Sequence, residues 1–193
     1  GTLRLLVTER EPVAQVYTLQ PRAKGGGYDP VVYHLDGAGY VIQPVDPRMR
    51  STEHPAGNEH YPTITGVPAS EMRPGRCIES RQLKAALELV QAFDSSPMVG
   101  LVGIGRIDLS VPEVLRVNTE SGTEILFGLD GIDRQLARWR LIHDLGIKLG
   151  RSVASLDLSV TNNLPARWAE AEVLPSGSPA KPVKTTRTRK KNV

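Results

Sequence analysis

Residues 31–44 read VVYHLDGAGYVIQP, and this stretch predicts a β-hairpin. Two runs rich in β-branched and aromatic residues, 31–35 and 40–43, flank the tetrapeptide DGAG at 36–39. Its two glycines can adopt the positive φ that tight hairpin turns require. We therefore expect a sheet built around this hairpin.

Two helices are expected downstream of the hairpin. In 79–94 apolar residues recur at steps of three and four, with Ser80 as the N-cap. The same spacing in 129–146 predicts a second helix, with Asp130 as its cap and Gly146 as its end.

Further strands are predicted by runs rich in β-branched and other apolar residues. These runs are 3–8, 12–19, 100–110, 114–119, 123–128, 152–160 and 164–168. We expect 23–30 to be a flexible connector and 45–76 to be a long loop that contains one ordered segment, YPTITG.

The predicted fold class is α+β, with a mainly antiparallel sheet on which two amphipathic helices pack. Residues 12–172 are expected to share one core, and 173–193 are expected to form a disordered basic tail. Six of the 24 basic residues follow the last acidic residue, Glu172, so the rest of the chain is slightly acidic. The basic character of the chain thus belongs to its tail.

Candidate residues for catalysis are few. His54 and His60 lie close to Glu53 and Glu59, but proline and glycine between them leave no fixed metal-ligand spacing. Cys77, the single cysteine, cannot form an internal disulfide and has no neighbouring histidine to activate it. A metal-dependent or nucleophilic enzyme built on 53–77 is a minor alternative, and we expect no catalytic residues, no cofactor and no metal.

A second alternative is a polyanion- or membrane-surface-binding module that acts through the basic tail. The tail could attract anionic lipid or another polyanion by charge alone. It lacks the interleaved aromatic residues that stack on single-stranded nucleic acid. We therefore expect no nucleic-acid partner.

Several segments taken together resemble the extracytoplasmic part of the bacterial cell-division protein family FtsQ, also called DivIB. The resemblance runs from about Leu5 to Trp168. It rests on VTEREPVAQV at 7–16, with the family's E-x-x-P-x-A corner, and on the D-x-x-G hairpin at 36–39. It also rests on YPTITG at 61–66, and on SVASLDLSV followed by LPARW near the end of the folded part.

The resemblance implies the family's β domain over 12–172, preceded at 1–11 by the last strand of a POTRA domain. It implies a non-enzymatic divisome scaffold at the extracytoplasmic (periplasmic) face of the cell membrane, at the division septum. The resemblance also implies attachment to the cytoplasmic membrane, which we expect to be made through an N-terminal anchor that these 193 residues do not include. The implied partners are FtsB/FtsL-type coiled-coil proteins, whose C-terminal segment adds a strand to the exposed last strand of the β domain.

Carried onto this sequence, the resemblance implies a partner-binding set near the end of the folded part. The set comprises Val160, Asn162, Asn163, Leu164, Ala166, Arg167 and Trp168. Trp168 has a second interpretation, closure of the core, which burial of its indole would favour. Pro165 cannot donate a ladder hydrogen bond, so one bond to a partner is lost if its nitrogen faces outward. Arg106 and Arg116 are candidates for holding an acidic side chain of the partner.

Overall fold

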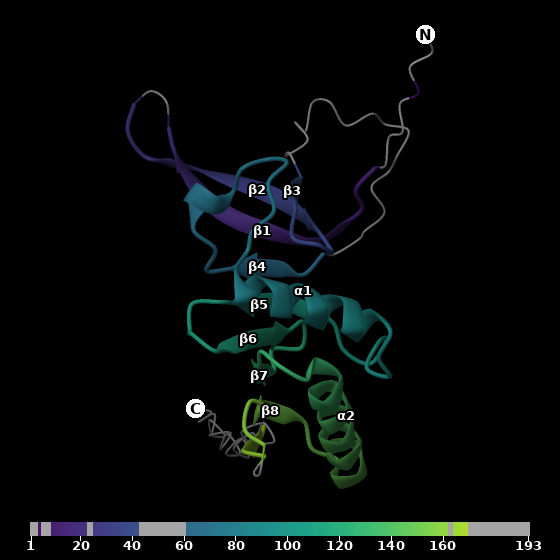
Figure 1. The fold of residues 1–193 in the computed structure, drawn as a ribbon. Coiled ribbons are helices and arrows are strands. Elements are labelled where there is room, and N and C mark those ends of the chain that lie inside the picture. The colour runs from purple at the N-terminus through teal and green to yellow at the C-terminus, as the bar shows by residue number, and fades with distance from the viewer. Residues whose placement is uncertain (1–3, 5–8, 23–24, 43–60, 162–163, 170–193) are drawn as a thin grey trace, which may run out of the picture.

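The computed structural model describes residues 4, 9–22, 25–42, 61–161 and 164–169. Within these ranges a nine-stranded sheet carries two long helices and one short 3-10 helix (Figure 1). The elements in chain order are β1 (Pro12–Pro21), β2 (Tyr28–Asp36), β3 (Val41–Ile42), β4 (Thr63–Thr65), η1 (Ala69–Glu71), α1 (Arg81–Asp94), β5 (Ile104–Asp108), β6 (Val114–Thr119), β7 (Glu124–Gly128), α2 (Ile132–Leu149), β8 (Val153–Asp157) and β9 (Ala166–Trp168).

The sheet is mixed, with strand order β3-β2-β1-β4-β5-β6-β7-β8-β9. The α+β class is as expected, but the expectation of a mainly antiparallel sheet is corrected, because β1/β4, β4/β5 and β7/β8 are parallel pairs. Helix α1 connects β4 to β5, and α2 connects β7 to β8. A helical crossover returns the chain to the end where the previous strand began, so the strands that it joins run parallel.

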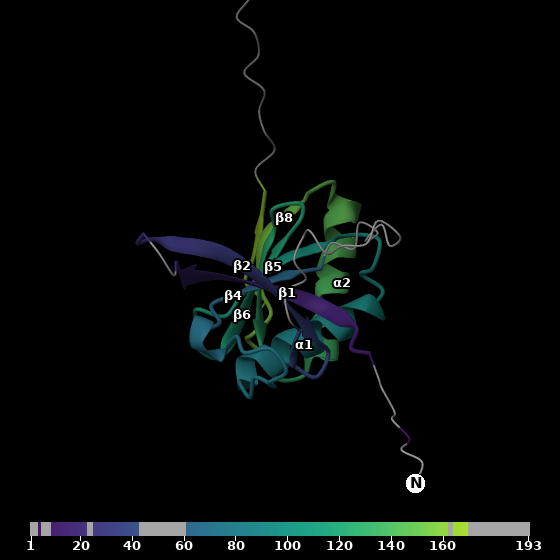
Figure 2. The ribbon, with the colours of Figure 1, turned by 90° about the horizontal axis from the view of Figure 1, so that it is seen from above.

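The core lies between the sheet and the two helices, which also contact each other. Three aromatic side chains join the layers: the Trp139 ring of α2 lies 6.0 Å from Phe127 of β7 and 5.8 Å from Phe93 of α1, centroid to centroid. All three side chains are buried. Viewed from above, the distal part of the β1–β2 hairpin projects away from this core (Figure 2).

The N-cap predicted for α1 is present, whereas both ends predicted for α2 differ from the structure. The hydroxyl of Ser80 accepts a hydrogen bond from the N–H of Leu83, so the predicted cap of α1 is confirmed. Helix α2 has Gly131 as N-cap instead of Asp130, and it continues past Gly146 to end at Gly150, whose φ is +63°. A left-handed glycine is the usual helix terminator, and Gly146 has another role described below.

The predicted hairpin at 31–43 is confirmed as far as residue 42, and the predicted hairpin at 114–128 and the ordered segment at 61–66 are confirmed. The connector is shorter than expected, because β2 already begins at Tyr28. Most of the POTRA-like strand at 3–8, residues 43–60 of the long loop, and the tail at 173–193 lie outside the described residues. Those expectations stay predictions.

Candidate partner-binding edge

Strand β9 forms one edge of the sheet. It pairs antiparallel with β8, and within the described ranges no strand pairs with its other side. The exposed edge of a sheet offers unpaired N–H and C=O groups that a strand from another chain can use. The predicted last strand is therefore present at the predicted position.

The peptide groups of the β9 segment alternate between its two sides. The N–H of Asp157 donates to the carbonyl oxygen of Pro165 at 2.9 Å, and the N–H of Ala169 donates to the carbonyl oxygen of Ser152 at 2.8 Å. Both bonds join the segment to the β8 side. In a β-strand, residues whose peptide groups face one neighbour alternate with residues whose groups face the other.

This alternation decides which residues can pair with an incoming strand. Pro165 shares its orientation with Ala169, so its missing N–H faces β8 and not the free side. Ala166 and Trp168 have the opposite orientation, so their N–H and C=O groups point to the free side of β9, away from β8. The proline in this segment therefore removes no hydrogen bond from a partner strand.

Trp168 is half-buried. Its exposure therefore does not decide between partner binding and closure of the core. A Cβ atom on Gly146 would come within 3.1 Å of the Trp168 ring and 2.7 Å of the carbonyl oxygen of Arg151. Gly146 thus leaves room for the indole against α2. The ring fixes β9 to the helix, and the rest of its surface stays accessible.

Residues 157–160, at the end of β8 and just after it, are held from two directions. The guanidinium of Arg138 in α2 donates to the carbonyl oxygens of Leu158 at 3.3 Å and Val160 at 2.9 Å. The carboxylate of Asp157 accepts from the N–H of Ser159 at 2.9 Å and from its hydroxyl at 2.6 Å. These bonds fix the chain as it leaves β8.

The remaining residues of the predicted partner-binding set occupy different environments. Val160 and Arg167 are exposed, whereas Leu164 and Ala166 are half-buried and pack against the core. Asn162 and Asn163 lie outside the described residues.

Arg106 and Arg116 do not lie beside the β9 edge. They belong to β5 and β6, and β6 is three strands away from β9, about 14 Å at the usual spacing between strands. The predicted arginine contact with a partner strand on β9 is therefore not supported by their positions.

The edge at the other end of the sheet is covered where β3 lies. The segment 75–78 pairs with β3: the N–H of Val41 donates to the carbonyl oxygen of Arg76 at 2.9 Å, and the N–H of Gly75 donates to that of Val41 at 2.8 Å. Beside β3, the DGAG turn between β2 and β3 encloses Asp36, a buried residue with 7% exposure. Its carboxylate accepts from the N–H groups of Ala38 and Tyr40 and forms an ion pair with Arg10.

This ion pair joins two motifs that the sequence places 26 residues apart. The Arg10 guanidinium also lies 3.7 Å from the centroid of the Tyr40 ring, within cation–π distance. Burial raises the pKa of Asp36, but hydrogen bonds from the Tyr40 N–H, the Arg10 guanidinium and the Ala38 N–H outweigh burial and hold that pKa below its ordinary value. Sequence analysis missed the pairing, because no local pattern links the two residues.

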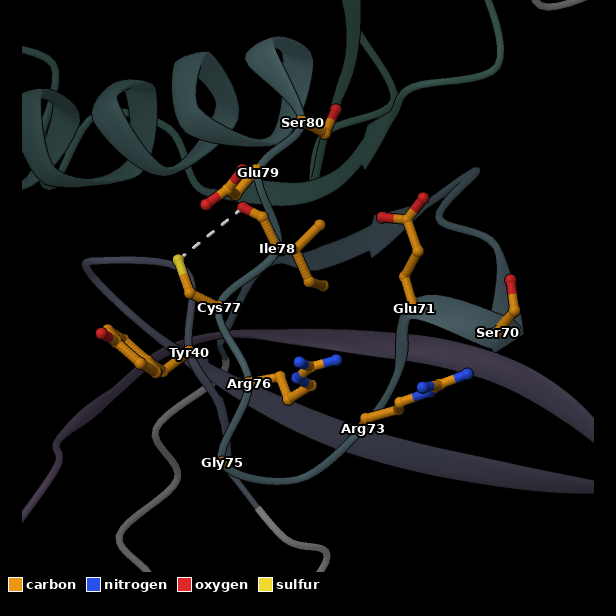
Figure 3. Close-up of a pocket in the computed structure, with 10 residues that line it drawn as sticks. All are labelled: Tyr40, Ser70, Glu71, Arg73, Gly75, Arg76, Cys77, Ile78, Glu79 and Ser80. Carbon is orange, nitrogen blue, oxygen red and sulfur yellow. Dashed lines mark hydrogen bonds between the residues drawn. The ribbon is translucent and has the colours of Figure 1, made fainter.

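Within the described ranges, little supports an enzyme site built on 53–77. A surface hollow beside β3 contains Cys77, with Arg73 and Arg76 pointing to the side away from the thiol (Figure 3). The thiol lies 3.3 Å from the carbonyl oxygen of Ala38, and no group of three His, Cys, Asp or Glu side chains in the described part could hold a metal ion. His54 and His60 lie outside that part.

Comparison with known proteins gives no functional assignment. No family model matches the chain, and no curated protein matches it. No helix in the described ranges is long and apolar enough to cross a membrane. The geometry of the sheet edges and the sequence resemblance remain as the indications of function.

Proposed function

We propose that this chain is a non-enzymatic scaffold of the FtsQ type, which binds an FtsB/FtsL-type coiled-coil partner by strand addition to β9. By the same resemblance it acts at the extracytoplasmic face of the bacterial membrane during septum formation. The observation that carries the proposal is the orientation of Ala166 and Trp168, whose peptide groups point to the free side of β9 while Pro165 faces β8.

Three features support strand addition at this edge in particular. The contact of Trp168 with Gly146 holds β9 against α2, and Arg138 holds the chain that follows β8, so little ordering of this edge is needed when a partner binds. Half-exposed Trp168 supplies the aromatic contact that dominates many interfaces. The opposite edge is covered at β3 by the segment 75–78, which leaves β9 as the better site for a strand.

The test is an NMR titration of the isotope-labelled chain with the C-terminal peptide of the FtsB-type partner. We expect chemical-shift changes concentrated in 164–169 and in β8, with changes at β2 no larger than at residues far from either edge. The variant Trp168→Ala should weaken binding by at least about tenfold, which corresponds to about 1.4 kcal/mol. Shifts confined to β2, or no shifts at saturating peptide, would rule the proposal out.

A further inference from the structure

Helix α2 carries an exposed row of leucines. Leu141, Leu145 and Leu149 are 69%, 43% and 55% exposed, and they follow one another at steps of four residues. Residues at this spacing form one continuous ridge on a helix, of the kind that packs into the groove of another helix. Adjacent exposed leucines on a folded domain commonly mark an interaction surface.

The leucine ridge is continuous with the β9 edge. Gly146, which contacts the Trp168 ring, lies one residue after Leu145 and three before Leu149. Figure 1 shows α2 running along the direction in which β6, β7 and β8 are stacked, with its C-terminal turn at the end of the sheet that carries β9. A protein that adds a strand to β9 thus has the ridge within reach.

Positive charge flanks the leucine ridge. Arg134 lies seven residues before Leu141 and Lys148 lies seven after it, so both share its side of the helix. Of the other charged side chains between them, Arg140 pairs with Asp144 at 2.8 Å, and Arg138 donates to the carbonyl oxygens of Leu158 and Val160. In the described ranges neither Arg134 nor Lys148 forms an ion pair within this chain, and an acidic partner is the complement of such a surface.

Strand addition to β9 alone also provides limited binding energy. Two outward-facing residues give at most four backbone hydrogen bonds, and each contributes about 0.5–1.5 kcal/mol net. A micromolar complex needs about 8 kcal/mol. A partner that binds firmly through this edge therefore requires further contacts beyond the backbone ladder.

We propose that the leucine ridge of α2 is a second docking surface for the partner that adds a strand to β9. The occupant is an amphipathic helix of that partner, with an apolar stripe placed on Leu141, Leu145 and Leu149 and acidic residues beside Arg134 and Lys148. This inference rests on the proposed function. It adds the surface of this chain on which the helical part of that partner docks.

The experiment compares two peptides of the FtsB-type partner by calorimetry on the full 193-residue chain. The short peptide contains only the C-terminal strand-forming segment, and the long peptide adds the adjoining end of the coiled coil. We expect the long peptide to bind at least about tenfold tighter. In the double variant Leu141→Glu/Leu145→Glu, the affinity for the long peptide should fall to that for the short peptide. The affinity for the short peptide should not change.

A matched control is Leu19→Glu, which places the same charge on a leucine that is 56% exposed on β1, far along the sheet from β9. It should leave the affinities for both peptides unchanged. Charge reversal by Arg134→Glu/Lys148→Glu should weaken only the long peptide, and added salt should reduce that difference.

The outcomes separate the two proposals. If the short peptide binds and the long peptide gains nothing, or if the double variant binds both as the parent does, the docking surface on α2 is wrong while strand addition stands. If neither peptide binds the parent chain, both proposals fail. Circular dichroism of each variant verifies that the loss of binding is not a loss of folding.

Discussion

The two edges of the sheet both contain a proline, and the two prolines have opposite consequences. At the β2 edge, the N–H of Arg22 donates to the carbonyl oxygen of Gly27 across the β1–β2 hairpin. With the register of this pair, the peptide groups of residues 29, 31 and 33 therefore face β1. Pro30 therefore faces outward and offers no N–H to an incoming strand. At the β9 edge, Pro165 faces β8 and leaves the outer side unaffected.

The difference shows that a proline protects an edge only when its nitrogen is on the free side. Outward prolines are one way in which proteins block unwanted strand pairing. On this basis the β2–β3 edge is closed by Pro30 and by the segment 75–78, and β9 is open.

The largest effect is expected at the closed edge, from Asp36→Ala. The substitution removes a buried carboxylate that accepts from two backbone N–H groups and from Arg10, and leaves those groups without their acceptor. We expect the free energy of unfolding to fall by about 2–3 kcal/mol. Urea denaturation measures this change, and a loss below about 1 kcal/mol would show that the hairpin turn does not depend on Asp36.

Gly146→Ala should have the next largest effect, at the open edge. In an ordinary helix interior this change stabilises by about 1 kcal/mol. Here the added Cβ meets the Trp168 ring and the carbonyl oxygen of Arg151, so we expect a loss of about 1–2 kcal/mol. Lys148→Ala, on the exposed side of α2, is the control and should change stability by under about 0.5 kcal/mol. A stabilised Gly146→Ala variant would contradict the described contact.

The stability supplied by Asp36 should depend on pH. Its pKa in the folded chain lies below the ordinary value of about 3.9, so its contribution is complete above that value and is lost as the pH falls through the folded pKa. The difference in unfolding free energy between the parent and Asp36→Asn should be constant from neutral pH to about pH 5 and shrink below about pH 4. A difference that grows on acidification would contradict the ion pair with Arg10.

The smallest effect on stability is expected from Pro30→Ala. The substitution restores an outward N–H on β2 and should change the free energy of unfolding by under about 0.5 kcal/mol. Its effect should appear in association instead, as a concentration-dependent increase in mass in sedimentation experiments. A variant that stays monomeric at high concentration would mean that something other than Pro30 protects this edge.

Local elements and the strand pairs within hairpins could be predicted from the sequence, but the parallel pairs between distant strands could not. The DGAG turn at 36–39 and the cap at Ser80 are local signals, and both features formed as predicted. The parallel pairs of β4 were missed, because a three-residue strand shows which residues face the core but not which strands lie beside it. Gly146 was misread as a helix end, because its role depends on the distant Trp168.

The candidate site shows the same limit. Residues 164–168 were predicted as the edge strand, and β9 forms over three of them, Ala166–Trp168. The orientation of Pro165 depends on the register between β8 and β9, which no sequence pattern near the proline reveals. The distance of Arg106 and Arg116 from β9 likewise follows from strand order and not from spacing along the chain.

The central claim is that an incoming strand pairs with the outward groups of Ala166 and Trp168. The most direct measurement compares the affinity of the FtsB-type C-terminal peptide for the parent, Pro165→Ala and Ala166→Pro chains. Pro165→Ala should leave the dissociation constant within about twofold of the parent, and Ala166→Pro, which removes an outward N–H, should weaken binding by at least about tenfold. Equal binding by Ala166→Pro, or a marked gain by Pro165→Ala, would contradict the account.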